Sequence, residues 1–373
     1  MPFIQRIVFI SFEEGLQTSE LAKSDPILGH KKMKWLPLLS PNYNIRLLNQ
    51  IGEFRKGVKF LRTVLKHEKI DLLIAHGAPA GAMASKALKG SNIPYLVTLF
   101  EPHADYMLES GVWCKLGLKY IMQRQWEKLQ KDNAAGLMPV TEGYKQRLLS
   151  EGLNVNKIAV APCSVEVTSF RFDLELRTDV RRALGWEFMT IGIYVGKYGG
   201  LYYSDEAFQI YRQCFEHIAD FRLIILSPQP KEEILRQLQY YSIDLSKVYI
   251  SAVGHTEVPA YLSAADFAFA TYKQGPSKRY LSPVKIGEYW ANGLPVLLTE
   301  SVGDESDIIK KEGGGALFNL KQKGSVAQAI QQIQAILKDP IHRQEIPKLA
   351  AKYRSPEKIR EAYEYFFNQQ KAT

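Results

Sequence analysis

Short apolar, β-rich runs alternate with longer helical patterns from one end of this 373-residue chain to the other. Most of these runs are apolar at consecutive positions, as expected for strands that helices cover on both faces. Strand followed by helix, repeated, predicts parallel sheets and therefore the α/β class. The expected strands are residues 7–10, 72–75, 95–98, 136–140 and 157–160 in the first half, and residues 191–195, 222–226, 248–250, 267–270 and 296–299 in the second.

The alternation is interrupted between about Cys163 and Arg182, where a mixed polar and charged segment replaces it. A chain of this length can hold two domains of ordinary size. The sequence therefore predicts two Rossmann-like, doubly wound parallel-sheet domains, residues 1–168 and 169–355. A final helix, residues 356–370, could cap either domain, including by packing back on the first.

The overall composition is that of a soluble globular protein, with 46% hydrophobic and 23% charged residues. Apolar runs stay well short of the ~20 residues that a membrane-spanning helix needs. The first ten residues are too short and strand-like for a secretory signal, so we expect a cytoplasmic protein. The cysteines Cys114, Cys163 and Cys214 lie far apart and are expected to be reduced, structural thiols.

Positive charge is concentrated in the first half, because roughly +7 of the net charge of +9 lies before Arg171. Two amphipathic helices, residues 50–69 and 113–131, are predicted there, each with an apolar face and a basic remainder. Such helices can make peripheral contact with an anionic membrane, although a solvated outer face has the same pattern. Nucleic acid binding is not expected, because the sequence contains no recognition motif or zinc spacing.

The stretch from Tyr280 to Thr299 is the most informative about function. Ser282 is a suitable N-cap and Pro283 fits the first helical position, so a helix is expected to begin there and to end at Asn292-Gly293. A helix N-terminus favours an anion such as phosphate, and a carboxylate one turn deeper suits a ribose hydroxyl. An ordinary capped helix of an α/β protein would have the same spacing.

Lys285 and Glu288 are three residues apart and therefore lie on one side of this expected helix. A second candidate phosphate site is the turn after residues 191–195, where Gly196, Gly199 and Gly200 allow close backbone approach and Lys197 could supply charge. Glycine-rich turns between a strand and a helix are common, so this turn alone does not establish a phosphate site.

Loops after the first-half strands hold further candidates. His103 follows residues 95–98, beside Glu101 and Asp105, either of which could hold its imidazole; a structural or surface histidine is the alternative. His76 has a similar position, with a tight turn as its simpler explanation. The loop after residues 7–10 contains only one glycine, Gly15, and therefore lacks the dinucleotide fingerprint. The signatures of P-loop proteins, α/β-hydrolases and zinc proteases are also absent from the sequence.

Taken together, these motifs resemble the glycosyltransferases of family 4, also called group 1, which have the two-domain GT-B fold. The likeness is strongest from Thr190 to about Asn319, above all in Ser282-Pro-Val-Lys-Ile-Gly-Glu-Tyr-Trp-Ala-Asn-Gly-Leu-Pro-Val296 followed by Gly303-Asp304. The resemblance implies a retaining enzyme that binds a sugar nucleotide on its second domain and an acceptor on its first, with no metal and no cofactor besides this substrate.

The resemblance also implies a role for each candidate residue. Glu288 would hold the ribose hydroxyls, Lys197 and the Gly196 to Gly200 turn would face the diphosphate, and His103 would lie near the transferred sugar. The expected catalytic residues are thus His103, Lys197 and Glu288. The expected donor-binding residues are Gly196, Gly199, Gly200, Tyr280, Ser282, Pro283, Val284, Lys285 and Glu288, and the acceptor-side candidates are Gly15, His76, Glu101 and Asp105.

One departure from the family pattern concerns the donor sugar. The family has a glutamate eight positions before the ribose-binding glutamate, and this chain has Tyr280 there. The leading interpretation is a glycosyltransferase that moves a sugar from a nucleotide-sugar donor to a glycan or lipid-linked acceptor in cell-surface polysaccharide synthesis. The alternatives are a sugar-nucleotide 2-epimerase of the same fold and a catalytically silent homologue that acts as a binding protein.

Overall fold

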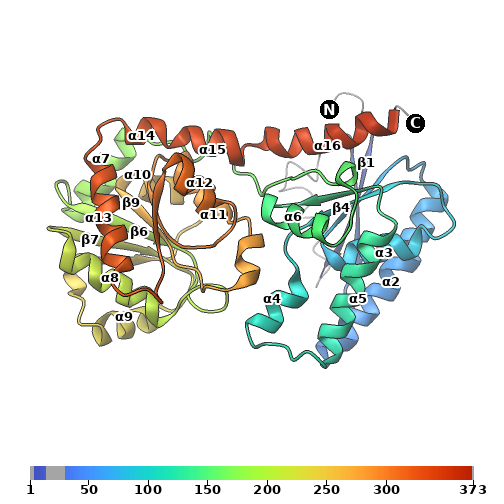
Figure 1. Cartoon of the computed structure of the whole chain (residues 1–373), viewed down its shortest axis with the longest axis horizontal. Helices are drawn as coiled ribbons and strands as arrows, with labels where there is room; N and C mark the ends of the chain where they lie inside the picture. Colours follow the sequence, from blue (N-terminus) through green and yellow to red (C-terminus); the bar gives the residue numbers. More distant parts are fainter. Residues whose placement is uncertain (1–3, 14–29, 372–373) are drawn as a thin grey trace. The chain divides into compact units, whose positions relative to one another are not determined.

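A computed structural model describes residues 4–13 and 30–371 of the chain (Figure 1). The chain divides into two compact units, the first made of residues 1–97 and 115–135 and the second of residues 98–114 and 136–373. Among the described residues, no helix is both long and apolar enough to cross a membrane.

In the first unit, a parallel pair of strands stands beside a group of packed helices. The strands β1 (Ile7–Glu13) and β2 (Met33–Leu39) pair in register from Ile7 opposite Met33 to Glu13 opposite Leu39. The helices pack closely: the rings of Phe54 and Trp126 stack with centroids 5.2 Å apart. The other elements of this unit are α2 (Arg46–His67), β3 (Leu73–His76), α3 (Ala78–Ala87), most of β4 (Tyr95–Leu99) and α5 (Leu118–Asp132).

Helices form at both segments predicted to be basic and amphipathic, as α2 and α5, but the predicted apolar inner face is wrong for α5, whose buried residues are Gln123, Trp126, Glu127 and Gln130. In α2 the buried and half-buried residues recur at helical spacing, so one face packs inward while the basic residues remain in solvent. The exposed basic residues of this region are Arg55, Lys56, Lys59, Arg62, Lys66 and Lys69.

The second unit contains a parallel sheet of six strands within residues 98–371, in the spatial order β11-β10-β9-β6-β7-β8. Counted along the chain from β6, this is the doubly wound order 6-5-4-1-2-3, in which successive strands are added outward on either side of the first. The strands are β6 (Thr190–Val195), β7 (Phe221–Leu226), β8 (Val248–Ser251), β9 (Phe267–Ala270), β10 (Val296–Thr299) and β11 (Gly315–Phe318).

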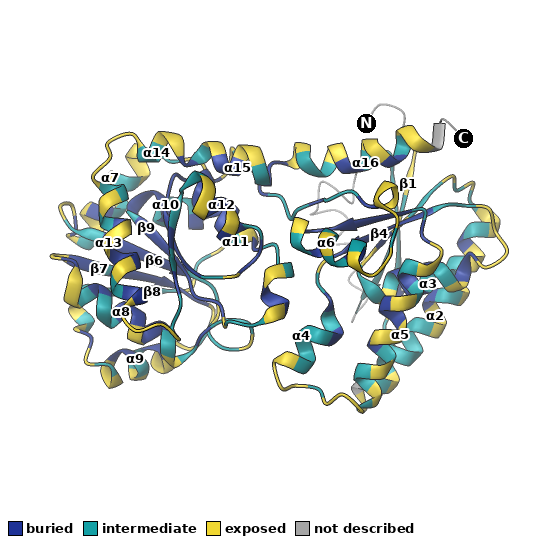
Figure 2. Cartoon of the chain, in the orientation of Figure 1, coloured by how far each residue is buried: buried dark blue, intermediate teal, exposed yellow. Residues whose placement is uncertain are grey.

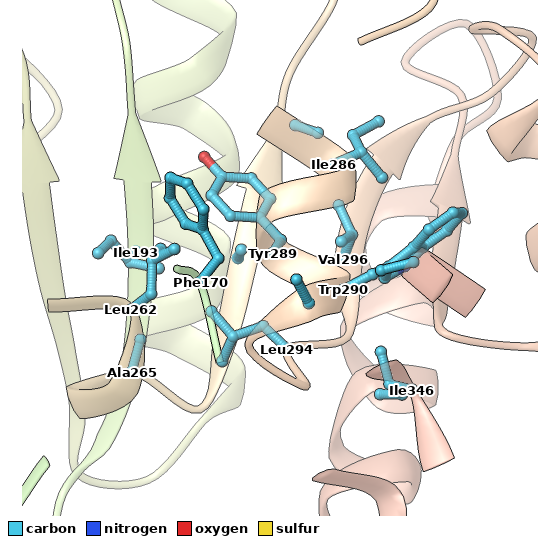
Figure 3. Close-up of a cluster of buried hydrophobic side chains, with 14 of the residues drawn as sticks. Phe170, Ile193, Leu262, Ala265, Ile286, Tyr289, Trp290, Leu294, Val296 and Ile346 are labelled. Atoms are coloured by element: carbon cyan, nitrogen blue, oxygen red, sulfur yellow. The ribbon is translucent and has the colours of Figure 1, made fainter. Parts of the chain in front are cut away.

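Helices cover both faces of this sheet, and alternate residues of each strand enter different cores (Figures 1 and 2). On β9, Ala268 and Ala270 belong to one hydrophobic cluster, whereas Phe267 and Phe269 belong to the other. This alternation explains the consecutive apolar residues of the sequence, since a strand buried on both sides has no solvent-facing position. Figure 3 shows the first cluster, which α11 enters with aromatic side chains.

Local sequence explains the helices of the second unit. For example, α13 buries Val326, Ala329, Ile330 and Ile333, which recur on one face. The helices are α4 (His103–Glu109), α6 (Glu142–Ser150), α7 (Leu174–Leu184), α8 (Asp205–His217), α9 (Lys231–Tyr240), α10 (Val258–Ala264), α11 (Val284–Ala291), α12 (Glu305–Glu312), α13 (Ser325–Leu337), α14 (His342–Glu345), α15 (Pro347–Arg354) and α16 (Pro356–Lys371), with 3-10 turns η1 (Val155–Lys157), η2 (Leu245–Lys247) and η3 (Pro276–Tyr280).

The remainder of the second unit is built around β5 (Gly136–Pro139). The chain after β4 runs beside it, because the Val140 N–H donates to the Leu99 carbonyl (3.1 Å). The final helix α16 contacts this region: the Tyr365 hydroxyl donates to the Asn156 carbonyl (3.2 Å).

The predicted α/β class with parallel sheets is confirmed, and the five strands expected in the second half all form within one residue of their predicted bounds. The strand expected at residues 157–160 is wrong. Val155–Lys157 forms the 3-10 turn η1, and Ile158 makes only an isolated parallel bridge to Leu137. The strands β2 and β11 were not predicted from the sequence.

Candidate functional site

The strand order of the second unit indicates where a ligand is expected to bind. The chain leaves β6 toward β7 on one side of the sheet and returns to β9 on the other, so the loops after β6 and β9 diverge at the carboxyl ends of adjacent strands. In open parallel sheets this divergence leaves a crevice, which is the usual ligand site. The candidate site is therefore built on the Gly196 to Gly200 turn after β6, the Thr271-Tyr272 segment after β9, and the helix α11.

The glycine-rich turn after β6 has a backbone that other residues would rarely adopt. Gly196, Gly199 and Gly200 have φ values of 138°, 81° and 60°. Gly196 is also constrained by space, because a Cβ atom there would lie 2.7 Å from the Lys285 Nζ atom. The turn thus brings bare backbone against the lysine of α11, and Tyr202 then bridges back to Tyr272.

Lys285 is the most unusual side chain of this site. Its ammonium group is buried and, within the part of the chain that the structure describes, has no hydrogen-bond partner. It lies over the rings of Tyr202, Tyr194 and Tyr272, with Nζ to centroid distances of 4.0, 5.0 and 5.9 Å. Burial lowers the pKa of Lys285 to about 7, against a smaller opposing effect of Glu288. An anion beside this ammonium would supply the missing hydrogen-bond acceptor and counter-charge.

The start of α11 differs from the prediction. The helix begins at Val284, Pro283 is its N-cap residue, and no side chain caps its first N–H groups. Ser282 is therefore not the N-cap, because its hydroxyl is engaged elsewhere: it accepts hydrogen bonds from the Cys163 N–H (3.0 Å) and from the buried Arg354 guanidinium. The predicted end of the helix is confirmed, with Asn292 as C-cap and Gly293 at φ 81°.

Glu288 lies one turn deeper in α11, and its carboxylate Oε1 atom is 3.1 Å from the Nε2 atom of His255. The Glu288 side chain is 11% exposed, whereas that of His255 is 73% exposed and packs its ring edge-on against Phe170. His255 was not predicted from the sequence as a site residue. Its position after β8, directly behind Gly254, is the same kind of signal that singled out His76 and His103.

His103 is the first residue of α4, and the structure selects its partner. Its Nδ1 atom lies 2.8 Å from Glu101 Oε1, and its ring makes an edge contact with Trp113 (5.5 Å between centroids). Asp105, the other candidate, pairs with Arg147 at 2.5 Å. The His103 side chain is 39% exposed, so its ring is held in place and remains accessible.

Tyr280, a donor-binding candidate, stands where the family that the sequence resembles has a second glutamate. Its ring lies 5.6 Å from that of Tyr144, and the Arg147 guanidinium lies 5.4 Å from its centroid. The residue is half-buried in η3 and is held by two side chains of α6.

The remaining predicted site residues lie in varied surroundings. Lys197 and Val284 are exposed. His76 is the last residue of β3 in the first unit and is followed by Gly77 at φ 82°, so a tight turn does occur there. Gly15 lies outside the described residues. Across residues 4–13 and 30–371, no three His, Cys, Asp or Glu side chains are grouped to hold a metal ion.

Comparison with protein-family models identifies the segment that carries this site. Residues 188–338, which include β6 to β11 and α11, match the model of the glycosyl transferases group 1. Over these residues the chain is similar to that family. A comparison with curated proteins found no match.

Solved structures of low sequence identity share the fold of this chain over nearly its whole length. Sucrose-phosphate synthase from Thermosynechococcus elongatus is 19% identical, with a TM-score of 0.66 over 92% of this chain and 84% of that one. HepE from Anabaena, in complex with UDP, is 13% identical, with a TM-score of 0.67 over 97% and 100%. The lipopolysaccharide outer core galactosyltransferase WaaB is 14% identical, with a TM-score of 0.63 over 93% and 87%. These similarities confirm the GT-B fold.

Proposed function

We propose that this glycosyltransferase binds a nucleotide-sugar at the sheet crevice and transfers the sugar, with retention of configuration, to a glycan or lipid-linked acceptor in cell-surface polysaccharide synthesis. The observation that supports this proposal best is the buried ammonium of Lys285, which has no hydrogen-bond partner among the described residues and lies beside the bare backbone of Gly196. A diphosphate is the anion that such a site suits, because it offers several acceptor oxygens to one cation and to the free N–H groups of a helix N-terminus.

In this mechanism the bond between the anomeric carbon and the diphosphate oxygen breaks, and the acceptor hydroxyl oxygen bonds to the same carbon. The acceptor proton passes to the departing nucleoside diphosphate. Lys285 and the N-terminus of α11 stabilise the negative charge that develops on that leaving group, with Lys197 at the rim of the site. Glu288 accepts hydrogen bonds from the ribose hydroxyls, and His103 lies beside the transferred sugar.

The first test of this function is calorimetric titration of the protein with UDP, GDP and ADP. UDP is the first choice because HepE, which shares the fold, was solved with UDP and with UDP-glucose. We expect at least one nucleoside diphosphate to bind with a 1:1 stoichiometry. Absence of binding by all three would favour the silent homologue. Incubation with the matching nucleotide-sugar alone then distinguishes a 2-epimerase, which needs no acceptor.

Replacing Glu288 with Gln is expected to weaken binding of that nucleoside diphosphate by about 10- to 100-fold, because a hydrogen bond to a charged group contributes ~1.5–3 kcal/mol. Titration with the 2′,3′-dideoxy analogue checks the assigned partner. The analogue is expected to bind the natural protein and the variant almost equally, since it lacks the hydroxyls that Glu288 holds. The control is His255→Asn, which removes the Glu288 contact but keeps the carboxylate. If Glu288→Gln still preferred the natural nucleoside diphosphate over the dideoxy analogue as strongly as the natural protein does, Glu288 would not be the residue that binds the ribose hydroxyls.

We further propose that the protein acts at the cytoplasmic face of a membrane, which it contacts through its basic helices α2 and α5. Apolar side chains are exposed at the start of α5, where Leu116, Leu118 and Ile121 are 88%, 72% and 52% exposed. Lys115, directly before Leu116, is also exposed. Exposed apolar side chains among basic residues are typical of a helix that rests on an anionic lipid surface.

The double variant Leu116→Ser/Leu118→Ser is expected to reduce sedimentation with vesicles of phosphatidylglycerol and phosphatidylcholine by about tenfold, because two inserted leucines are lost. Binding of the natural protein is expected to weaken as salt is added, since screening acts on the basic residues. Phe188→Ser is the matched control, because Phe188 is 96% exposed but lies in the second unit. Absence of vesicle binding by the natural protein at low salt would contradict the membrane role. It would not bear on the proposed donor site.

A further inference from the structure

A buried lysine outside the proposed chemistry ties the His103 helix to the loop that leads into α11. Lys278, in η3, is 3% exposed, and its ammonium lies 2.9 Å from Glu109 Oε1 and 4.4 Å from the centroid of the Tyr106 ring. Glu109 is the last residue of α4, and His103 is the first. The ion pair between Glu109 and Lys278, which are 169 positions apart in the sequence, therefore joins the end of the His103 helix to η3.

Glu109 grips the backbone of η3 as well as its side chain. Its second carboxylate oxygen accepts the Ser277 N–H at 2.7 Å. Burial raises the pKa of Glu109, but the hydrogen bonds from Ser277 and Lys278 outweigh this effect and lower it, so the carboxylate is ionised. Gly275 leaves room for this contact, because a Cβ atom there would lie within 1.6 Å of Glu109 Oε1.

A second link connects the same two elements. Asp105, on α4, pairs with Arg147 of α6, and that guanidinium covers the ring of Tyr280 at the end of η3. Of two carboxylates four residues apart on this short helix, Glu109 thus contacts η3 directly, and Asp105 is linked to its last residue through Arg147. Because a helix rises ~1.5 Å per residue, Glu109 lies ~9 Å along the axis from His103. Fixing the end of such a short helix fixes the direction in which its first residue projects.

η3 is also joined to the segment that leads into α11 and to the loop after β10. The Lys278 carbonyl accepts the N–H groups of Leu281 (3.2 Å) and Gly303 (3.0 Å), so the turn is tied to the residue that follows it and to the loop after β10. Only four residues separate η3 from Lys285. Any displacement of η3 on ligand binding would therefore be transmitted both to α11 and to α4.

We propose that Lys278 and Glu109 are positioning residues that set the placement of His103 according to the conformation of the loop from Pro276 to Pro283. The inference rests on the proposed function for the role of His103, and the contact itself is independent of that role. The pair touches neither of the residues expected to bind the nucleotide, Lys285 and Glu288. The pair therefore affects the rate of transfer by setting the position of His103, because a displacement of about 1 Å in a reacting group can slow catalysis strongly.

Amide hydrogen exchange of residues 103–113 in Lys278→Met and Glu109→Gln tests the placement without any substrate. We expect exchange of this segment to accelerate at least tenfold in both variants, because the helix loses the tie at its end. Lys278→Arg keeps the charge and is expected to restore much of the protection. Lys273→Met is the matched control, since Lys273 is an exposed lysine of the preceding loop. Unchanged exchange in the two variants would overturn the proposal, and Glu109→Gln provides the result if Lys278→Met does not fold.

Binding and kinetics separate this role from a general structural one. The nucleoside diphosphate Kd of Glu109→Gln is expected to stay within about threefold of the natural value, while kcat falls at least tenfold with the donor KM unchanged. A loss of binding that matches the loss of kcat would overturn the positioning role. If the natural protein binds no nucleoside diphosphate, the proposed function fails, whereas the exchange measurement still decides whether the pair places the helix.

Discussion

Replacing Lys285 with Met is expected to stabilise the ligand-free protein and, at the same time, to weaken nucleoside diphosphate binding by about 100-fold. The ammonium is buried among three tyrosine rings without a hydrogen-bond partner in the described residues. Methionine fills a similar volume without charge or donors, so the free energy of unfolding is expected to rise by on the order of 3 kcal/mol. Binding weakens because the diphosphate loses its buried cation.

The free energy of unfolding and the affinity for the nucleoside diphosphate are expected to change with pH in opposite directions. The pKa of Lys285 is lowered to about 7 in the folded protein, whereas an unperturbed lysine titrates near 10.5. Between these values the unfolded chain binds more protons, so the free energy of unfolding is expected to rise with pH above about 7 and to be flat below it. A bound diphosphate favours the protonated amine, so affinity is expected to fall as pH rises through the same window.

Urea unfolding and calorimetric titration at pH 6, 7, 8 and 9 measure both trends. Titration in buffers of different ionisation enthalpy is expected to reveal net proton uptake on binding near pH 8. Lys285→Met is expected to abolish both pH dependences, and Lys323→Met, at an exposed position, is expected to keep them. A natural protein whose diphosphate affinity does not change between pH 6 and 9 would contradict the assignment of Lys285 as the diphosphate ligand.

Replacing Arg354 with Met is expected to lower the free energy of unfolding by about 3–5 kcal/mol, the usual effect of removing one partner of a buried ion pair. Arg354 is 2% exposed and pairs with Glu305, which is completely buried. The same guanidinium donates to the Ser282 hydroxyl and to the Cys163 carbonyl (3.3 Å). The variant therefore leaves a carboxylate without its counter-ion and releases the loop that precedes α11.

Equilibrium urea unfolding measures this effect, and a lower midpoint with an unchanged slope would show a loss of stability alone. The double variant Arg354→Met/Glu305→Leu is expected to regain much of the loss, because it removes the uncompensated charge. Lys352→Met serves as the control: Lys352 pairs with Glu312 at 2.8 Å on the surface, and its replacement is expected to change little. If Arg354→Met and Lys352→Met had similar urea midpoints, the buried pair of Arg354 and Glu305 would not contribute to stability as expected.

Strand prediction succeeded where burial on both sheet faces left a continuous apolar run, as in residues 267–270 and 296–299. It failed at β2, which contains Pro37 in its middle. Proline cannot donate to a ladder and is normally confined to edge strands. Here β2 pairs with β1 in a sheet of two strands among the described residues, so one of its edges needs no partner. β11 was missed because Gly313, Gly314 and Gly315 suggest a loop, although a short strand begins at the last of them.

Only those parts of the candidate site that depend on local sequence spacing could be predicted. Gly196, Lys285 and Glu288 were found from their positions relative to strand and helix ends. The tyrosine rings around Lys285 and the contact of His255 with Glu288 depend on contacts between different strands and loops, and no local pattern encodes them. The same limit explains Ser282, whose hydroxyl is taken by Arg354, 72 residues away in the sequence.

The small residues of β9 have a consequence for how such a protein can vary. Ala268 and Ala270 face the cluster that receives Ile286, Tyr289 and Trp290 from α11, as Figure 3 shows for the α11 side chains. Protein interiors are packed too densely to absorb extra methylene groups without movement. Two methyl groups therefore act as a spacer that sets how deeply α11 seats against the sheet. Replacing either alanine with a larger residue would shift the position of α11. The geometry of the ligand site would then change although every residue proposed to contact the ligand stays the same.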